Sequence, residues 1–192
     1  AAAVTADGSL YTWGAHLQTK LGIGDPSAPE TPVLVSTLSN VVSVSLWDYG
    51  ALTCAAVTAD GSLYAWGDVL QSYGNSTMYS VPHKIEGVSD ATAAFAGEGS
   101  RFSYIAKDGT LYSCGLPNGN SSPAGMQKVL SDVVSMSYGR LTACAVTADG
   151  TLYTWGYHYD FALGLSREQA ANLTNSYAPQ PIPILENIRK AH

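Results

Sequence analysis

Charge is scarce in this sequence, and positive charge is the scarcest. Charged residues make up 12% of the 192 residues, with Lys+Arg at 9 against Asp+Glu at 15, and the formal net charge is −6. Nucleic-acid-binding surfaces need clustered Lys and Arg to neutralise phosphates. We therefore expect no nucleic acid among the partners of this protein.

Cysteine and long apolar runs are also scarce. Cys54, Cys114 and Cys144 are an odd number of cysteines without C-x-x-C spacing. We expect them to be buried apolar side chains, and we expect neither a disulfide framework nor a zinc site. No apolar run approaches the length of a membrane span, so we expect no membrane contact.

A single pattern recurs four times and organises the chain. It occupies Ala2 to Gly14, Ala55 to Gly67, Ser103 to Gly115 and Cys144 to Gly156, and the second copy reads AAVTADGSLYAWG. Each copy contains an Asp-Gly pair, and all but the third carry Trp before the final Gly, where the third has Cys114. Self-similarity at intervals of about 40 to 50 residues indicates a repeat architecture.

Each copy predicts a β-hairpin. Asp-Gly between two apolar runs is typical of a type I′ turn, which needs positive φ at both central residues. The run after the turn is apolar on both faces, with Leu63 and Ala65 on one side and Tyr64 and Trp66 on the other. A strand buried on both faces lies between two sheets. We therefore predict an all-β fold, a β-propeller of four-stranded antiparallel blades.

The second unit shows the expected plan of one blade. We predict strands at Val41 to Leu46, Ala55 to Thr58, Ser62 to Trp66 and Val81 to Ile85, with a variable loop from Asp68 to Tyr79. The same plan divides the single repeat domain, residues 1–192, into units of approximately 1–40, 41–87, 88–132 and 133–192.

These residues carry a family resemblance. Trp13-Gly14, Leu21-Gly22-Ile23-Gly24, Pro32-Val33 and the hairpin ending in Trp66-Gly67 resemble the repeat of the regulator of chromosome condensation family. The resemblance implies four-stranded propeller blades, usually seven to a ring. This sequence also differs from the family pattern in two ways. Thr53 and Thr142 stand where the family often has His, and the third unit lacks the Leu-Gly-x-Gly segment.

The termini predict an incomplete propeller. The sequence starts at Ala1, directly in the second strand of a blade, and it ends shortly after the last strand of the fourth unit, near Ile184. Open ends would expose sheet edges and apolar faces. We expect these residues to belong to a longer chain, or to complete a ring with another copy or fragment.

The topology predicts which loops gather together. In an up-and-down blade, the first and third connections emerge on one face, and the Asp-Gly hairpins emerge on the opposite face. The first face is rich in aromatic residues and Arg, the side chains favoured as interface anchors. The predicted partner-binding residues are Trp47, Asp48, Tyr49, Arg101, Tyr138, Arg140, Tyr157, Tyr159 and Phe161.

Nothing in the sequence predicts catalysis, a metal site or a cofactor. The Asp residues of the Asp-Gly pairs are turn formers by position. His16 and His158 occupy equivalent repeat positions and could hold a metal with Asp160, but the simpler interpretation is that each replaces a loop Asn by hydrogen-bonding the backbone. No glycine-rich loop has the spacing of a phosphate cradle.

The sequence therefore predicts a non-catalytic module that binds another protein through aromatic loops. The alternative, implied by the family resemblance, is a guanine-nucleotide exchange factor for a small GTPase. An enzyme is disfavoured, because no constellation of carboxylate, His and nucleophile is present. Low charge and the triplets Asn75-Ser76-Thr77, Asn120-Ser121-Ser122 and Asn172-Leu173-Thr174, which match the glycan acceptor sequence, favour an extracellular or cell-surface location.

Overall fold

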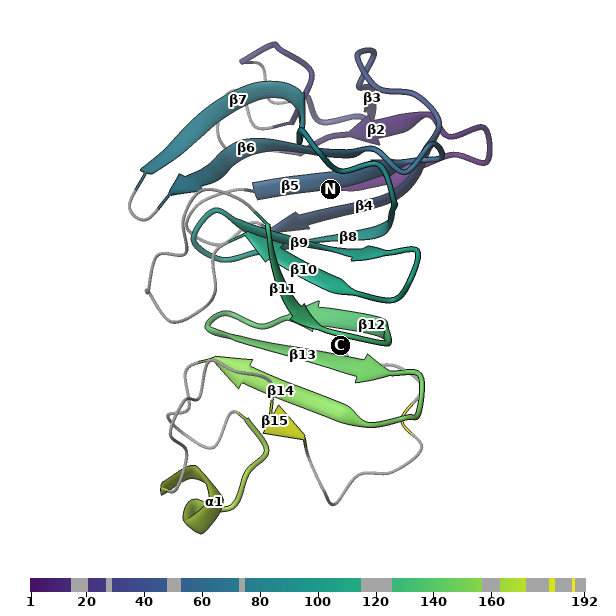
Figure 1. Ribbon diagram of the computed structural model, residues 1–192. Coiled ribbons are helices and arrows are strands. Elements are labelled where there is room, and N and C mark those ends of the chain that lie inside the picture. Colours follow the sequence, from purple (N-terminus) through teal and green to yellow (C-terminus); the bar gives the residue numbers. More distant parts are fainter. Residues whose placement is uncertain are drawn as a thin grey trace.

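The computed structural model describes residues 1–14, 21–26, 29–47, 53–72, 75–114, 126–156, 163–171, 180–181 and 188. Four antiparallel sheets follow one another in chain order, from the purple and blue strands to the green and yellow ones in Figure 1. Within each sheet, strands that are adjacent in the sequence are adjacent in space. The predicted all-β fold of antiparallel blades is confirmed.

The first blade has three described strands, and each of the others has four. Blade 1 contains β1 (Ala2–Val4), β2 (Leu10–Thr12) and β3 (Val33–Leu34). Blade 2 contains β4 (Val41–Trp47), β5 (Thr53–Thr58), β6 (Leu63–Ser72) and β7 (Asn75–Lys84). Blade 3 contains β8 (Ala91–Gly97), β9 (Arg101–Ala106), β10 (Leu111–Cys114) and β11 (Gln127–Leu130). Blade 4 contains β12 (Val133–Tyr138), β13 (Thr142–Thr147), β14 (Leu152–Gly156) and β15 (Gln180–Pro181), with the short helix α1 (Arg167–Ala171) before β15.

The apolar cores lie between neighbouring blades. Leu63 and Ala65 belong to the core between blades 2 and 3, and Trp66 belongs to the core between blades 1 and 2. All three side chains are fully buried. The predicted two-faced character of β6 is therefore confirmed, and it explains why a single blade could not be stable alone: each blade buries its faces only against its neighbours. No helix in the described ranges is long and apolar enough to cross a membrane.

The Asp-Gly turns differ from the predicted type I′ geometry. In the first hairpin, Gly8 N donates to Thr5 O at 2.9 Å, so Ala6 and Asp7 are the central residues of the turn. Gly8 has φ 81°, whereas Asp7 is not among the residues with positive φ. The turn is thus a type I turn followed by a left-handed glycine. The Asp7 carboxylate favours this geometry, because it accepts hydrogen bonds from the Thr5 hydroxyl and from Ser9 N.

The Asp-Gly turns also connect neighbouring blades. Val41 N, at the start of β4, donates to Gly8 O at 2.9 Å, and Ala59 N returns a bond to Asn40 O at 2.8 Å. The same two-bond tie joins blade 3 to blade 2 through Gly61, and blade 4 to blade 3 through Gly109. A Cβ at Gly61 would lie 2.4 Å from Ser89 O, so the close approach of the next blade requires glycine at this position.

The predicted loop from Asp68 to Tyr79 is instead a β-hairpin. β6 and β7 continue past the blade as a pair, with Asp68 opposite Met78 and Val69 opposite Thr77. Figure 1 shows this extension projecting beyond the neighbouring sheets. Val69 is buried in the core against blade 3, which anchors the base of the extension. We call residues 68–72 and 75–79 the β6–β7 arm.

The three cysteines are free thiols. Cys54 and Cys114 are buried and Cys144 is half-buried, as expected of small apolar side chains. Burial raises the pKa of the Cys114 thiol to about 11, so it stays protonated at neutral pH. Cys114 occupies the position that Trp66 has in blade 2, and its core includes Phe102 and the partly buried ring of Tyr79 from the preceding blade.

Candidate partner-binding face

The strand directions gather two kinds of connection on opposite sides of the stack. The ends of β4, β6, β10 and β14 point toward one side, on the left of Figure 1, where the first and third connections of each blade emerge. We call this side the loop face. The Asp-Gly turns and the links between blades emerge on the other side, which we call the hairpin face. Of the predicted binding residues, the structure describes Trp47, Arg101, Tyr138 and Arg140, and these lie at or next to strand ends on the loop face.

The inner strands of neighbouring blades align the residues of the loop face. Ala94 N donates to the Ser43 hydroxyl at 3.1 Å, and Ala96 N donates to the Ser45 hydroxyl at 3.0 Å. These bonds satisfy backbone groups on the inner edge of β8. Trp47 is the last residue of β4, two residues after Ser45.

A charged pair connects blades 3 and 4 on the loop face. Arg140 Nε lies 3.7 Å from Glu98 Oε1, and the side chains are 66% and 19% exposed. Glu98 Oε2 is buried and has no hydrogen-bond partner in the described part of the chain. Arg101 opens β9 opposite Gly97 and brings a second guanidinium group to this region. The structure therefore assembles Trp47, Arg101 and Arg140, which were predicted from the sequence, at the ends of three successive blades.

Tyr138 lies between blades rather than outside them. Its hydroxyl hydrogen-bonds with the hydroxyls of Ser103 and Ser113 on blade 3. Its ring covers Gly97, where an added Cβ would lie 2.8 Å from the ring. Burial raises the pKa of the Tyr138 phenol. The Tyr138 ring thus holds the β12–β13 connection, which contains Arg140, against blade 3. The phenol hydroxyl of Tyr138 points inward, toward Ser103 and Ser113.

The β6–β7 arm adds a surface that the sequence interpretation missed. Met78 is 47% exposed on β7, and it lies directly opposite Asp68 in the register of the pair. The available signal was Gly74-Asn75, a turn sequence between two runs that could have paired. Asn75, part of one Asn-x-Ser/Thr triplet, is the first residue of β7.

Several predicted residues lie outside the described part of the chain. They are Asp48, Tyr49, Tyr157, Tyr159 and Phe161 of the binding set, together with His16, His158 and Asp160, and Asn120 and Asn172 of the glycan triplets. Among the residues that the structure does describe, no three His, Cys, Asp or Glu side chains form a group able to hold a metal ion.

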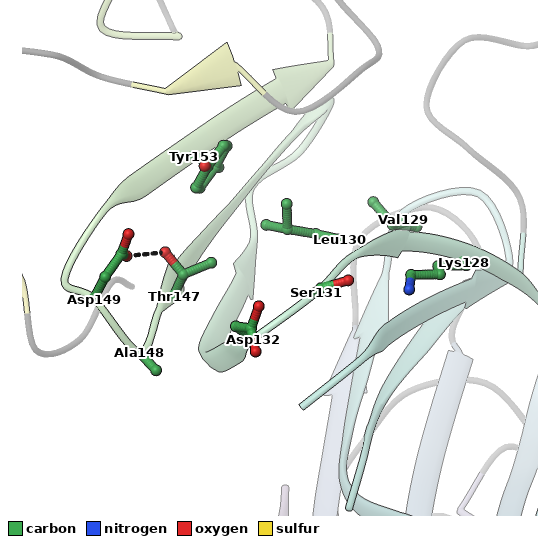
Figure 2. A pocket seen from close by; sticks show the side chains of 9 residues that line it. All are labelled: Lys128, Val129, Leu130, Ser131, Asp132, Thr147, Ala148, Asp149 and Tyr153. Carbon is green, nitrogen blue, oxygen red and sulfur yellow. Dashed lines mark hydrogen bonds between the residues drawn. The ribbon is translucent and has the colours of Figure 1, made fainter. Parts of the chain in front are cut away.

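The hairpin face has a hollow of about 580 Å³ between blades 3 and 4. Figure 2 shows its lining, with Lys128 on the right, Asp149 on the left below Tyr153, and Asp132 between the two ends. The Thr147 hydroxyl donates to Asp149 Oδ1 at 2.6 Å, and this bond is the first cause of the lowered pKa of Asp149. The Asp149 carboxylate is therefore already hydrogen-bonded within its own turn.

The same hollow recurs between blades 1 and 2. It has a volume of about 400 Å³ and is lined by Asn40, Asp60 and Tyr64, which are the repeat equivalents of Asp132, Asp149 and Tyr153. A feature that repeats with the blade follows from the blade geometry, because each inter-blade link arches over the preceding Asp-Gly turn. We therefore attribute the hollows to the blade architecture rather than to a binding site.

Comparisons with known proteins agree with this architecture. Residues 7–51 and residues 133–167 match the family model described as Regulator of chromosome condensation (RCC1) repeat. The chain is 31% identical over 180 residues to human E3 ubiquitin-protein ligase HERC2, which covers 85% of this chain and 4% of the ligase. It is 26% identical over 190 residues to mouse RCC1-like G exchanging factor-like protein, covering 85% of this chain and 40% of that protein.

A solved structure extends the comparison to the fold. The crystal structure of human WBSCR16 superposes with a TM-score of 0.74 at 25% identity, covering 95% of this chain and 50% of that one. This chain spans half or less of the length of each of these proteins. The fold and the repeated ties define a β-propeller repeat protein. Its repeats belong to the regulator of chromosome condensation type, so the resemblance seen in the sequence is confirmed.

Proposed function

We propose that this chain is a non-catalytic protein-binding module whose loop face holds the partner. The observation that carries the proposal is the position of Trp47, Arg101 and Arg140, each at the loop-face end of strands in one of three successive blades. Trp and Arg dominate the energetics of known protein interfaces, because they bury large areas and form several contacts at once. Tyr49, Tyr157, Tyr159 and Phe161 belong to the same proposed surface through their places in the sequence.

The charge distribution supports a partner that presents a carboxylate. The hairpin face carries the turn carboxylates Asp7, Asp60, Asp108 and Asp149. The described cations on the loop face are guanidinium groups, which bind carboxylates through paired hydrogen bonds. The β6–β7 arm offers the partner an additional apolar contact, because Met78 on β7 is 47% exposed.

The test uses variants with substitutions on one face or the other. Wild-type protein first captures the partner from the native source, and the affinity of each variant for the purified partner is then measured. Trp47→Ala with Tyr49→Ala should weaken binding by about 2 kcal/mol or more. Arg140→Ala should also weaken it. Lys107→Ala removes one positive charge from an exposed position on the hairpin face and is the matched control for Arg140→Ala.

Folding of each variant is followed by thermal unfolding. Equal loss of affinity in Arg140→Ala and Lys107→Ala would contradict a loop-face site. Unfolding of the Trp47→Ala, Tyr49→Ala variant would assign those rings to the core and would remove them from the proposed surface.

Nucleotide exchange on a small GTPase is the second candidate. It is favoured by the 26% identity to mouse RCC1-like G exchanging factor-like protein. A nucleotide-release assay against a panel of small GTPases tests it directly. Faster release that is lost in Arg140→Ala and kept in Lys107→Ala would assign exchange to the loop face. Unchanged release across the panel would leave the binding module as the function.

A further inference from the structure

β7 is the outer edge strand of blade 2. The strand order of this sheet is β4-β5-β6-β7, so β7 pairs with a strand on one side only. Blade 2 packs against blade 1 on one face and against blade 3 on the other, with β7 at its outer edge. An edge strand leaves the N–H and C=O groups of alternate residues without a strand partner, and these groups can pair with another chain.

Two hydrogen bonds show which backbone groups of the β6–β7 arm point outward. Gly24 N donates to Ser80 O at 3.1 Å, so the Ser80 carbonyl points away from β6, toward blade 1. The Thr53 hydroxyl donates to Asp68 O at 2.9 Å, so the Asp68 carbonyl points toward β5 rather than toward β7. Asp68 lies opposite Met78 in the register. Because backbone groups alternate in direction along a strand, both bonds place the N–H and C=O of Met78 on the outer edge.

The same alternation places the N–H and C=O of Ser76 on the outer edge, because residues 76–79 pair one for one with β6. Ser76, Thr77 and Met78 are all exposed. Apart from the bond at Ser80, the part of the chain that the structure describes places no backbone partner along the outer edge of β7. The arm therefore presents main-chain donors and acceptors to solvent.

The other half of β7 carries features that block strand addition. Its pairing with β6 is interrupted by a register shift between Ala65 and Gly67. Pro82 has no N–H to donate, and Lys84 adds a charge. Natural sheets protect exposed edges with bulges, proline and lysine of this kind. The arm half, residues 75–79, has neither a charged residue nor a proline, so the protection ends where the arm begins.

The side chain of Met78 defines what kind of segment fits this edge. It is 47% exposed, and it lies on the same strand edge as the outward backbone groups. Side chains directly opposite each other on paired strands pack together, and apolar and β-branched pairs are the favourable ones. Ser76 and Thr77 are uncharged and offer no counter-ion to a charged neighbour. The edge therefore fits an extended, uncharged segment with an apolar or β-branched residue beside Met78.

We propose that the partner of the loop face adds such a segment to β7 as an additional strand of blade 2. The inference rests on the proposed function, because an edge of residues 76–78 is too small to hold a partner alone. Specific protein interfaces bury about 1,200 Å² or more. The arm projects on the loop face (Figure 1), so a partner already held there reaches the edge without a second association from solution.

Backbone hydrogen exchange tests the inference on the unmodified 192-residue chain. The probe is the partner purified by capture on the wild-type protein, and amide exchange is read residue by residue by NMR. The Ser76 and Met78 amides should exchange rapidly in the chain alone and roughly tenfold or more slowly in the complex. The Thr77 amide faces β6 by the same alternation and is the internal reference, protected in both states. Unchanged exchange at Ser76 and Met78 in the complex would overturn the proposal.

Proline substitution tests the outward N–H of Met78. Met78→Pro removes this N–H and keeps the ladder with β6, as an edge position allows. It should raise the dissociation constant for the purified partner roughly tenfold or more. Met78→Val is the matched control, because it keeps the N–H and a strand-forming side chain, and it should change the constant less than roughly threefold. Equal losses in the two variants would reduce the arm to a side-chain contact and overturn strand addition.

Thermal unfolding checks the direction of the backbone groups. Met78→Pro should melt close to the wild type, whereas Thr77→Pro removes an N–H that faces β6 and should lower the melting temperature. Equal melting temperatures for the two proline variants would contradict the assignment of the outer edge. If Met78→Pro fails to fold, the exchange of the wild-type amides decides, since it needs no substitution.

Arg140→Ala separates this inference from the proposed function. Lost affinity in Arg140→Ala with unchanged affinity in Met78→Pro would keep the loop-face site and overturn strand addition. The reverse result would support strand addition and contradict the loop-face site. Sedimentation of the chain alone tests the remaining occupant: a dimer that Met78→Pro dissociates would assign the edge to a second copy of this chain and would overturn the proposal.

Discussion

Neighbouring blades contact each other in two places, on the hairpin face and on the loop side, and different interactions stabilise the two contacts. On the hairpin face, the same two backbone bonds tie every described pair of blades, from the Gly8 tie to the Gly109 tie. On the loop side, the rings differ: Trp66 from a third strand covers Gly22, whereas Tyr138 from an inner strand covers Gly97. The ties use backbone groups, so apart from the glycine of each turn they do not depend on particular side chains, whereas the ring on the loop side comes from different strands in different joints. The hairpin half can therefore repeat while the loop half varies, and variation is what a binding face needs.

The largest effect should come from the ring on the loop side. Trp66→Ala removes a fully buried side chain. It should lower the free energy of unfolding by about 3–5 kcal/mol, as for other large-to-small changes in a core. Thermal and urea unfolding would measure this. Trp13→Ala is the matched control, with a smaller expected loss because its ring is half-buried; an equal loss would contradict the comparison.

The hairpin half should respond to a single methyl group. Gly61→Ala places a Cβ 2.4 Å from Ser89 O at a residue with φ 85°. Left-handed strain and the clash together should cost about 2–4 kcal/mol. Gly87→Ala shares a positive φ of 79° but has open space around it, so it should lose only about 1–2 kcal/mol. Equal losses in urea unfolding would show that the close approach to the next blade has no energetic weight.

A smaller effect is expected from the hydroxyl of Tyr138. Tyr138→Phe keeps the ring on Gly97 and removes the hydrogen bonds to Ser103 and Ser113. Both serines are buried, so the variant should lose about 1–2 kcal/mol of unfolding free energy. Chemical unfolding gives the stability, and partner affinity should change less than in Arg140→Ala. A stable variant with lost affinity would instead place the hydroxyl in the interface.

The smallest effect should be a change in acid sensitivity on the hairpin face. Hydrogen bonds from Thr58 and Ser62 lower the pKa of Asp60 from its ordinary value of 3.8 to about 2. A carboxyl with a lowered folded-state pKa stabilises the fold above its unfolded pKa and loses that contribution as pH falls. Melting temperatures of wild type and Asp60→Asn should therefore converge between pH 4 and pH 2. A constant difference over that range would contradict the assignment.

The repeat and its mode of packing could be predicted from the sequence. The fourfold Asp-Gly pattern and the two-faced run at Leu63 to Trp66 require neighbouring sheets, because one hairpin cannot bury both faces. It also placed Trp47, Arg101 and Arg140 on one face, since strand direction alternates along a meander. These are local consequences of period and topology, and they do not depend on the partners of individual side chains.

Features that depend on contacts between residues far apart in the chain could not be predicted in this way. The turn type is a local exception, because the Thr–Asp–Ser hydrogen bonds that select type I join residues two apart in the sequence, although Asp-Gly alone favours another geometry. The β6–β7 arm forms because Val69 is buried against blade 3, and Tyr138 turns inward because Ser103 and Ser113 lie across the joint. The arm and the inward ring each depend on a neighbour from another blade, and no periodicity in the sequence encodes that neighbour.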